Sequence, residues 1–133
     1  MTVSQVQRVT GYLFQESEDT LECGLVGIAS HKMYSKSEMV ALWFFVYEGR
    51  VVGAEVWDSA TKTNRGVGYK DPESKVLAAH MGQIEKVANP SLDNYSELYI
   101  WSSDRSSAVR FRSNGNYIYV LQAGLAPYIA RCM

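Results

Sequence analysis

The chain has 133 residues, of which 47% are hydrophobic and 20% are charged. This composition excludes an intrinsically disordered chain, and the length suits one domain with a substantial core, so we expect residues 1–133 to form a single domain. Lys and Arg number 13 and Asp and Glu number 14, giving a net charge of −1. That charge excludes a global attraction to nucleic acid or to an anionic membrane.

The first segment, residues 3–14, is ambiguous. Its β-branched residues favour a strand with a bend near Gly11, but the spacing of Val3, Val6 and Val9 does not keep a period of two. A short helix at residues 3–9 is therefore the alternative. An acidic turn at residues 15–20 precedes a second expected strand at residues 21–29.

The most apolar stretch of the chain is residues 40–57. Every side chain from Val40 to Tyr47 is apolar, which predicts a strand that is covered on both faces. Glu48-Gly49 then predicts a tight turn into a second strand at residues 51–57. A buried helix beginning at Ser37 is the alternative, but the β-branched and aromatic content favours the hairpin.

A helix is predicted over about residues 72–88. Asp71 is a capping residue, Pro72 suits the first helical position, and Glu73 complements the positive end of the helix. Asn89-Pro90 is the expected end. The apolar positions that repeat at helical spacing, and that we expect to pack on the central hairpin, are Leu77, Met81, Ile84 and Ala88, with Val87 and His80 beside them.

The remaining sequence predicts a three-stranded meander at residues 97–102, 107–112 and 117–122. Asn114-Gly115 between the last two strands is a strong hairpin signal. The apolar tail, residues 123–133, contains Pro127 and predicts a short helix or a docked extension. An exposed apolar tail would be a candidate interface for a homo-oligomer.

The elements follow the order ββββ-α-βββ. This order predicts an α+β fold, in which a mostly antiparallel sheet of six to seven strands carries one main helix.

No motif in the sequence specifies a catalytic, metal or cofactor site. The only histidines, His31 and His80, have no second ligand at metal-binding spacing, so we expect neither a metal nor a cofactor. Cys23 and Cys132 are too few for a disulfide framework and predict reduced thiols in the cytoplasm. No run reaches the roughly twenty apolar residues of a membrane span, and the N-terminus has no apolar signal core.

The candidate binding surface lies in the meander, where arginines alternate with aromatic residues. Its members are Tyr99, Trp101, Arg105, Arg110, Arg112, Tyr117 and Tyr119. We expect the face with Arg110 and Arg112 to be at least partly exposed, because two unpaired guanidinium groups are rarely buried. Arg, Tyr and Trp are enriched in interface hot spots and on surfaces where bases stack. An ordinary solvated sheet face with cation–π contacts has the same composition.

These observations predict a small binding module that docks onto a protein partner, as an adaptor or inhibitor. Small proteins without motifs are typical of viral or mobile-element antagonists of host machinery. Single-stranded nucleic-acid binding on the same face is the alternative, although few basic residues are present. A metal-dependent hydrolase or nuclease is the third hypothesis, using Asp58, Asp104 and a helical acid such as Glu73 or Glu85. An enzyme is the less favoured class.

Overall fold

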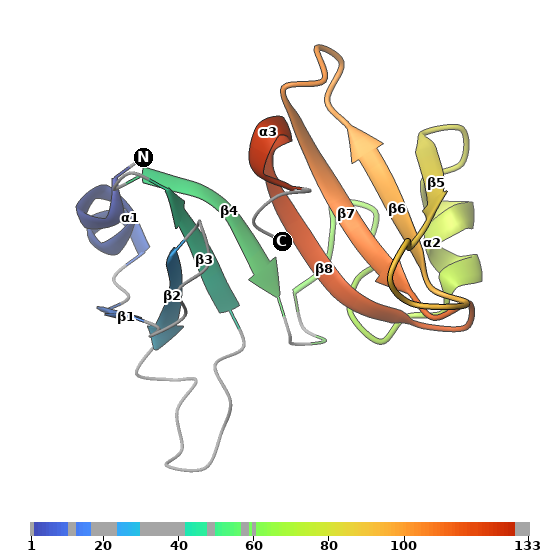
Figure 1. The fold of residues 1–133 in the computed structure, drawn as a ribbon, viewed down its shortest axis with the longest axis horizontal. Helices are drawn as coiled ribbons and strands as arrows, with labels where there is room; N and C mark the ends of the chain where they lie inside the picture. Colours follow the sequence, from blue (N-terminus) through green and yellow to red (C-terminus); the bar gives the residue numbers. More distant parts are fainter. Residues whose placement is uncertain are drawn as a thin grey trace.

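The computed structural model describes residues 2–10, 13–16, 24–29, 42–47, 50–56, 59 and 61–129. Within the described residues, two runs of four strands are separated by a helix and flanked by one helix at each end, an α+β arrangement (Figure 1). In chain order they are α1 (Val3–Thr10), β1 (Leu13–Glu16), β2 (Gly24–Ala29), β3 (Leu42–Tyr47), β4 (Arg50–Val56), α2 (Glu73–Ala79), β5 (Ile84–Ala88), β6 (Ser96–Trp101), β7 (Ser107–Ser113), β8 (Ile118–Leu125) and α3 (Ala126–Ile129).

The strands form one sheet in the order β1-β2-β3-β4-β8-β7-β6-β5, and each neighbouring pair is antiparallel. Two meanders, β1–β4 and β5–β8, meet where β4 pairs with β8 (Figure 1). The predicted α+β class with an antiparallel sheet is therefore confirmed. Within the described residues the sheet has eight strands, where six to seven were predicted.

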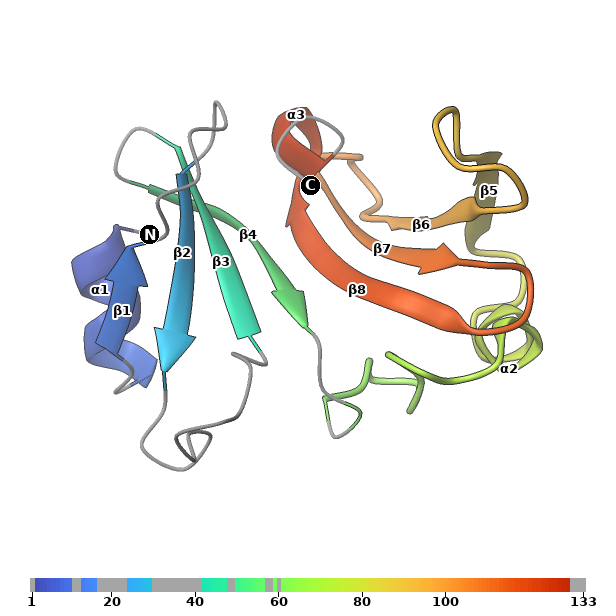
Figure 2. The same ribbon diagram turned by 60° about the horizontal axis from the view of Figure 1, so that its bottom comes forward.

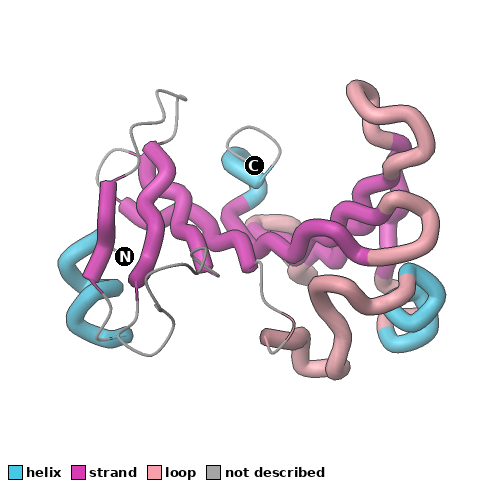
Figure 3. Tube along the Cα trace, turned by 90° about the horizontal axis from the view of Figure 1, so that it is seen from below, coloured by secondary structure: helices cyan, strands magenta, loops and turns pink. Residues whose placement is uncertain are grey.

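The connection between the two meanders crosses one face of the sheet. After β4 the chain runs beneath β8 to α2 and then enters β5 at the far edge (Figure 2). Figure 3 shows α1, α2 and this connection on one side of the sheet and α3 on the other. We call the side that carries α2 the helix face, and the opposite side of β5–β8 the open face.

The predicted helix over residues 72–88 is wrong in its extent. Helix α2 spans only Glu73–Ala79, and residues 84–88 form the edge strand β5 beside β6. Gly82 takes a φ of +79°, a left-handed conformation that favours glycine and breaks the helical path. The apolar residues from 84 to 88 fit a helical period. They nevertheless form a strand, whose backbone hydrogen bonds are made to β6 and not within a helix.

The face that α2 buries also differs from the prediction. Met81 is 81% exposed and Leu77 is 38% exposed, whereas Val76 is completely buried. Glu73 and His80 are buried beside Val76, so the inward face of the helix is partly polar. The sheet that α2 covers belongs to the second meander and not to the central β3–β4 hairpin.

The main core lies between α2, the connecting segment and the helix face of the sheet. Leu98, Phe111 and Leu121 occupy opposite positions on β6, β7 and β8, and therefore point to the same side. Val67 and Val76 cover them from the connection and from α2. A smaller cluster, formed by β3, β4 and α3, joins Phe45 and Val52 to Tyr47 and Tyr128.

Several local predictions are confirmed or resolved. Residues 3–10 form a helix, which decides the ambiguity at the N-terminus. The hairpin between β3 and β4 is present, although its Glu48-Gly49 turn lies outside the described residues. The β7–β8 hairpin is also present, but its turn is longer than two residues. Asn114 Oδ1 accepts the N–H groups of Asn116 and Tyr117, and Gly115 takes a φ of +95°.

The apolar tail forms the short helix α3 as far as Ile129, which is completely buried. The Tyr128 ring lies 5.1 Å from the Tyr47 ring, so this part of the tail is docked on its own sheet. Residues 130–133 and the cysteines Cys23 and Cys132 lie outside the described residues. Among the helices that the structure describes, none is long and apolar enough to cross a membrane.

The depth of Val76 in the core gives a direct test of how α2 is oriented. We expect Val76→Ala to lower the free energy of unfolding by about 1.5 to 3 kcal/mol, because it removes two buried methyl groups and leaves a cavity. The matched variant Leu77→Ala should cost less than about 1 kcal/mol, since that side chain is partly exposed. Urea unfolding followed by circular dichroism measures both values. A larger loss for Leu77→Ala would contradict this orientation.

Candidate functional site

The open face gathers most of the predicted binding residues, because of how β6, β7 and β8 align. Tyr99 lies opposite Arg110, which lies opposite Gln122. Glu97 lies opposite Arg112, and Trp101 lies opposite Ala108. Alternation along each strand therefore places these side chains on the face that points away from α2.

The centre of this face is a buried polar network around Glu97. Arg112 Nε donates to Glu97 Oε1 at 2.7 Å, and Asn89 Nδ2 donates to the same oxygen at 2.8 Å. Arg110 Nε donates to Gln122 Oε1 at 2.7 Å and lies 3.7 Å from Glu97 Oε2. We call Glu97, Arg110, Arg112 and Gln122 the Glu97 network.

The expectation that the face with Arg110 and Arg112 is at least partly exposed is wrong for Arg110 and holds for Arg112. Arg110 is only 4% exposed, and Glu97 and Gln122 are equally buried. Arg112 is half-buried and keeps 25% of its side chain exposed. The expectation assumed that the guanidinium groups were unpaired, whereas Glu97 supplies a carboxylate between them.

A second group, which we call the stack, consists of Tyr99, Trp101 and Arg105. The Tyr99 and Trp101 rings are nearly parallel at 11°, with centroids 5.3 Å apart. The Arg105 guanidinium lies 4.7 Å from the centroid of the Trp101 ring, in cation–π geometry. Arg105 also donates to Glu85 Oε2 at 3.2 Å across to β5.

The turn at residues 102–106 holds Arg105 in place. Asp104 Oδ1 accepts the O–H and N–H of Ser106, at 2.7 and 3.0 Å, and the O–H of Ser102 at 2.8 Å. These bonds from Ser106 and Ser102 lower the pKa of Asp104 to about 2. Arg105 itself takes a φ of 58°, a left-handed conformation that points to a constrained turn.

The other two predicted residues lie apart from the stack. Tyr119 is 58% exposed, and its ring meets Tyr95 edge-on at 6.3 Å. Tyr117 is 56% exposed, and its backbone is bridged to Pro72 at the start of α2. Five of the seven predicted residues are therefore brought together, and Tyr117 and Tyr119 are placed at the end of the β7–β8 hairpin.

A cavity of about 340 Å³ opens beside the Glu97 network. The side chains of Glu97, Tyr99, Arg110 and Arg112 line it from the sheet, and residues 89–92 line it from the β5–β6 loop. Asn89 Oδ1 shapes this loop by accepting the N–H groups of Ser91 and Leu92. Sequence analysis missed both Glu97 and the loop. The signal was present, because Glu97 precedes Tyr99 by two positions and therefore shares its face.

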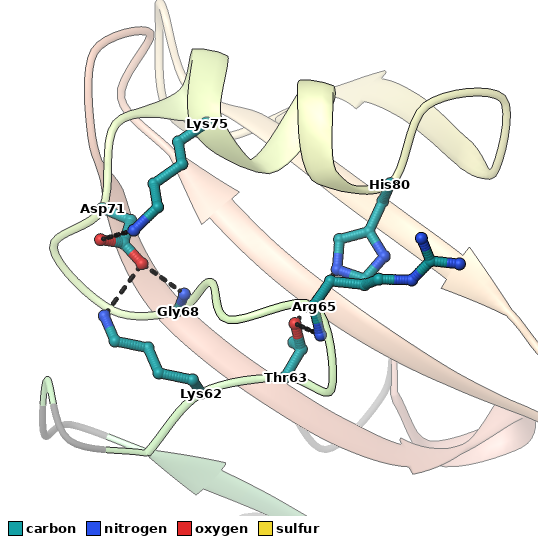
Figure 4. Close-up of polar contacts among 7 residues, drawn as sticks. All are labelled: Lys62, Thr63, Arg65, Gly68, Asp71, Lys75 and His80. Atoms are coloured by element: carbon teal, nitrogen blue, oxygen red, sulfur yellow. Dashed lines mark hydrogen bonds and ion pairs between the residues drawn. The ribbon is translucent and has the colours of Figure 1, made fainter.

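The helix face carries a different set of polar contacts, which join parts of the connection to one another and to α2 (Figure 4). Asp71 accepts the Gly68 N–H at 2.8 Å and the ammonium groups of Lys62 and Lys75 at 2.9 and 3.3 Å. Burial raises the pKa of Asp71, but the hydrogen bonds from Lys62, Gly68 and Lys75 outweigh burial, so the pKa lies below its ordinary value. Asp71 was expected to cap α2, but no side chain caps that helix.

His80 is a buried structural residue at the end of α2. Its Nε2 lies 3.1 Å from Thr63 Oγ1 of the connection, and its ring centroid lies 6.2 Å from that of Phe111 (Figure 4). Glu73 is buried at the other end of α2 and accepts hydrogen bonds from Lys86 at 2.6 Å and Ser113 at 2.7 Å. These contacts occupy the groups that could otherwise act as bases or ligands.

The residues considered for a hydrolase are not assembled by the described part of the chain. Asp104 belongs to the 102–106 turn, Glu85 pairs with Arg105, and Glu73 lies on the helix face. Asp58 lies outside the described residues. Among the described residues, no three or more His, Cys, Asp or Glu side chains form a group that could hold a metal ion.

Comparison with known proteins informs the fold only. No protein-family model matches the chain, and no curated protein matches it. The fold is similar to the crystal structure of an extracellular protein containing an SCP domain from Bacillus anthracis str. Ames, with a TM-score of 0.58 and 10% sequence identity. The similarity covers 98% of this chain but 45% of that protein, so this chain spans less than half of its length.

The burial of Arg110 predicts a structural role for its charge. We expect Arg110→Ala to lower the free energy of unfolding by about 3 kcal/mol, because it removes one partner of a buried ion pair and leaves Gln122 without its donor. The matched variant Arg105→Ala should cost less than about 1 kcal/mol, since its ion pair is exposed. Chemical denaturation of the purified variants measures both values. Equal stability of Arg110→Ala and the unaltered protein would contradict the Glu97 network.

Proposed function

We propose that this protein is a binding module that docks onto a protein partner through the stack and the surrounding open face. The observation that carries the proposal is the stack itself. It places two flat aromatic side chains and a guanidinium side by side on a sheet surface, with Arg105 61% exposed. Tyr, Trp and Arg are the residue types that contribute most binding free energy at protein interfaces.

Pre-organisation supports the same proposal. Tyr99 and Trp101 are half-buried in the sheet, and Arg105 is held by the Trp101 ring, by Glu85 and by the 102–106 turn. Side chains that are already ordered lose less conformational entropy when a partner binds.

The charge arrangement favours a protein over single-stranded nucleic acid. Glu97 offsets charge from both Arg110 and Arg112, and Glu85 pairs with Arg105. Paired arginines release fewer counterions when they meet phosphates, which weakens electrostatic binding. The Tyr99 and Trp101 rings also stack on each other, so fewer ring faces are open to bases.

A role as an adaptor or inhibitor, including an antagonist of host machinery, is part of this proposal, and so is a cytoplasmic location. The support for the location is that two cysteines are too few for the disulfide framework of a secreted domain.

The proposal is tested by capture from a nuclease-treated lysate of the source cell with three baits. We expect the unaltered protein to retain a stoichiometric protein partner and Arg105→Gln to retain about fivefold less, since a hot-spot Arg contributes more than about 1 kcal/mol. Arg65→Gln is the matched control, because Arg65 is exposed on the connection that covers the helix face. The Arg65→Gln bait should retain as much partner as the unaltered protein does.

Two results would contradict the proposal. One is a partner that binds all three baits equally, which would place the interface elsewhere. The other is recovery of nucleic acid alone when nuclease is omitted. Thermal unfolding of each bait shows that any loss of binding does not arise from misfolding.

A further inference from the structure

The carboxylate and amide acceptors that line the cavity beside the Glu97 network are occupied or covered. Glu97 Oε1 already accepts from Arg112 and Asn89, and Glu97 Oε2 is buried out of reach. Asn89 Oδ1 already accepts the N–H groups of Ser91 and Leu92. A ligand that enters the cavity therefore gains little from these groups by offering a hydrogen-bond donor.

Arg112, in contrast, presents donors to the same cavity. In the described part of the chain only its Nε donates to a protein acceptor, Glu97 Oε1. Its two Nη groups are not among the buried side-chain atoms that lack a partner, so they are accessible. Arg112 lines the cavity and keeps 25% of its side chain exposed. The Nη groups can therefore donate to an acceptor that enters the cavity.

Charge favours a neutral acceptor over a carboxylate at this position. The Arg112 guanidinium is already paired with Glu97, whose Oε1 lies 2.7 Å from its Nε. A ligand carboxylate on the same guanidinium would place a second negative charge near Glu97, and the two would repel. Arg110 adds no spare positive charge, because it is buried and is engaged by Glu97, by Gln122 and by a further contact. A neutral carbonyl accepts from Arg112 without this repulsion.

The rest of the cavity lining suits an apolar ring. Pro90 and Leu92 line the cavity from the loop, and Tyr99 lines it from the sheet. A volume of about 340 Å³ lies at the small end of ligand pockets, so the cavity takes a short part of an extended chain and not a folded element. Tyr99 also belongs to the stack, so the cavity adjoins the surface that docks the protein partner.

Proline is the residue that combines these requirements. Its carbonyl accepts hydrogen bonds, but within a chain it has no N–H group that would need an acceptor in the cavity. Its ring is apolar, and proline-rich segments form an extended polyproline II helix without internal hydrogen bonds, which leaves their carbonyls available. Such segments bind in grooves lined by aromatic side chains, and they lose little conformational entropy because they are already extended.

We propose that this cavity binds a proline residue from an extended, proline-rich segment of the protein partner. The proline carbonyl accepts from the Nη groups of Arg112, and the proline ring packs against Tyr99 and Leu92. The inference rests on the proposed function, since it names the kind of segment through which the partner docks.

The test titrates the unaltered protein at neutral pH with three peptides, each acetylated and amidated, and with one carboxylate. The peptides are hexaproline, hexasarcosine, which lacks both N–H groups and rings, and hexaalanine, which has N–H groups. The carboxylate is 3-phenylpropionate. NMR signals of the Arg112 Nε–Hε group and of the Tyr99 ring report binding. We expect hexaproline to bind about tenfold more tightly than each of the other three, because only it combines a neutral carbonyl, an apolar ring and no N–H group.

A pair of matched variants locates the site. Leu92 lines the cavity and is 43% exposed, whereas Leu77 lies on α2 and is 38% exposed. We expect Leu92→Ala to weaken hexaproline binding by about fivefold, since it removes apolar surface that the ring covers. Leu77→Ala should leave the affinity unchanged. If Leu92→Ala fails to fold, the order of affinities on the unaltered protein still decides the question.

Three results would overturn the proposal. One is that hexaproline leaves the Arg112 and Tyr99 signals unchanged. Another is that one of the other three probes binds as tightly as hexaproline, which would show that the features of proline do not select the ligand. The third is equal affinity of folded Leu92→Ala and Leu77→Ala for hexaproline.

Repeating the capture from lysate with excess hexaproline separates this inference from the docking proposal. Release of the partner by hexaproline supports the proline site. A partner whose retention depends on Arg105 but which hexaproline does not release would leave the docking proposal intact and overturn the proline site. If no protein partner is captured, the docking proposal fails, and the titrations of the purified protein decide the cavity.

Discussion

The ion pairing of Glu97 with two arginines is the interaction on which the open face depends. One buried and one half-buried guanidinium group lie there on the same face of the sheet. Their burial would be strongly unfavourable without a carboxylate between them. Because β6 and β7 are antiparallel neighbours, Glu97 lies opposite Arg112 and diagonally beside Arg110. Alternation along β6 places Tyr99 and Trp101 on the same face as Glu97. The geometry of this one strand therefore positions both the network and the stack.

The helix face gives this surface a rigid support. The connection between the meanders is fastened by Asp71 and by the contact of Thr63 with His80, while Glu73 ties α2 to Ser113 on β7. The core side chains that pack around Phe111 stabilise the side of β7 that faces α2. Strand β7 therefore carries a core residue on one face and the arginines of the network on the other. A site on such a strand is held in a defined geometry, as a binding surface requires.

Much of the fold was predictable from sequence because local signals determine it. The apolar run of residues 42–47 and the Asn114-Gly115 turn both predicted antiparallel hairpins that the structure contains. The error at residues 84–88 arose because a short apolar pattern fits either period, and pairing at a sheet edge decides between them. The site was predictable in its residue types but not in its burial. Whether Arg110 is exposed depends on Glu97, thirteen positions earlier, and that pairing follows only from strand alignment.

The most direct test of this account is the hydrogen exchange of the arginine Nε–Hε groups, measured by NMR at neutral pH. The account predicts slow exchange for Arg110 and Arg112, whose Hε atoms are held by Gln122 and Glu97. Arg65, which is exposed, serves as the internal reference for fast exchange. Exchange of Arg110 as fast as that of Arg65 would show that its guanidinium is solvated, and would contradict the Glu97 network as the basis of the open face.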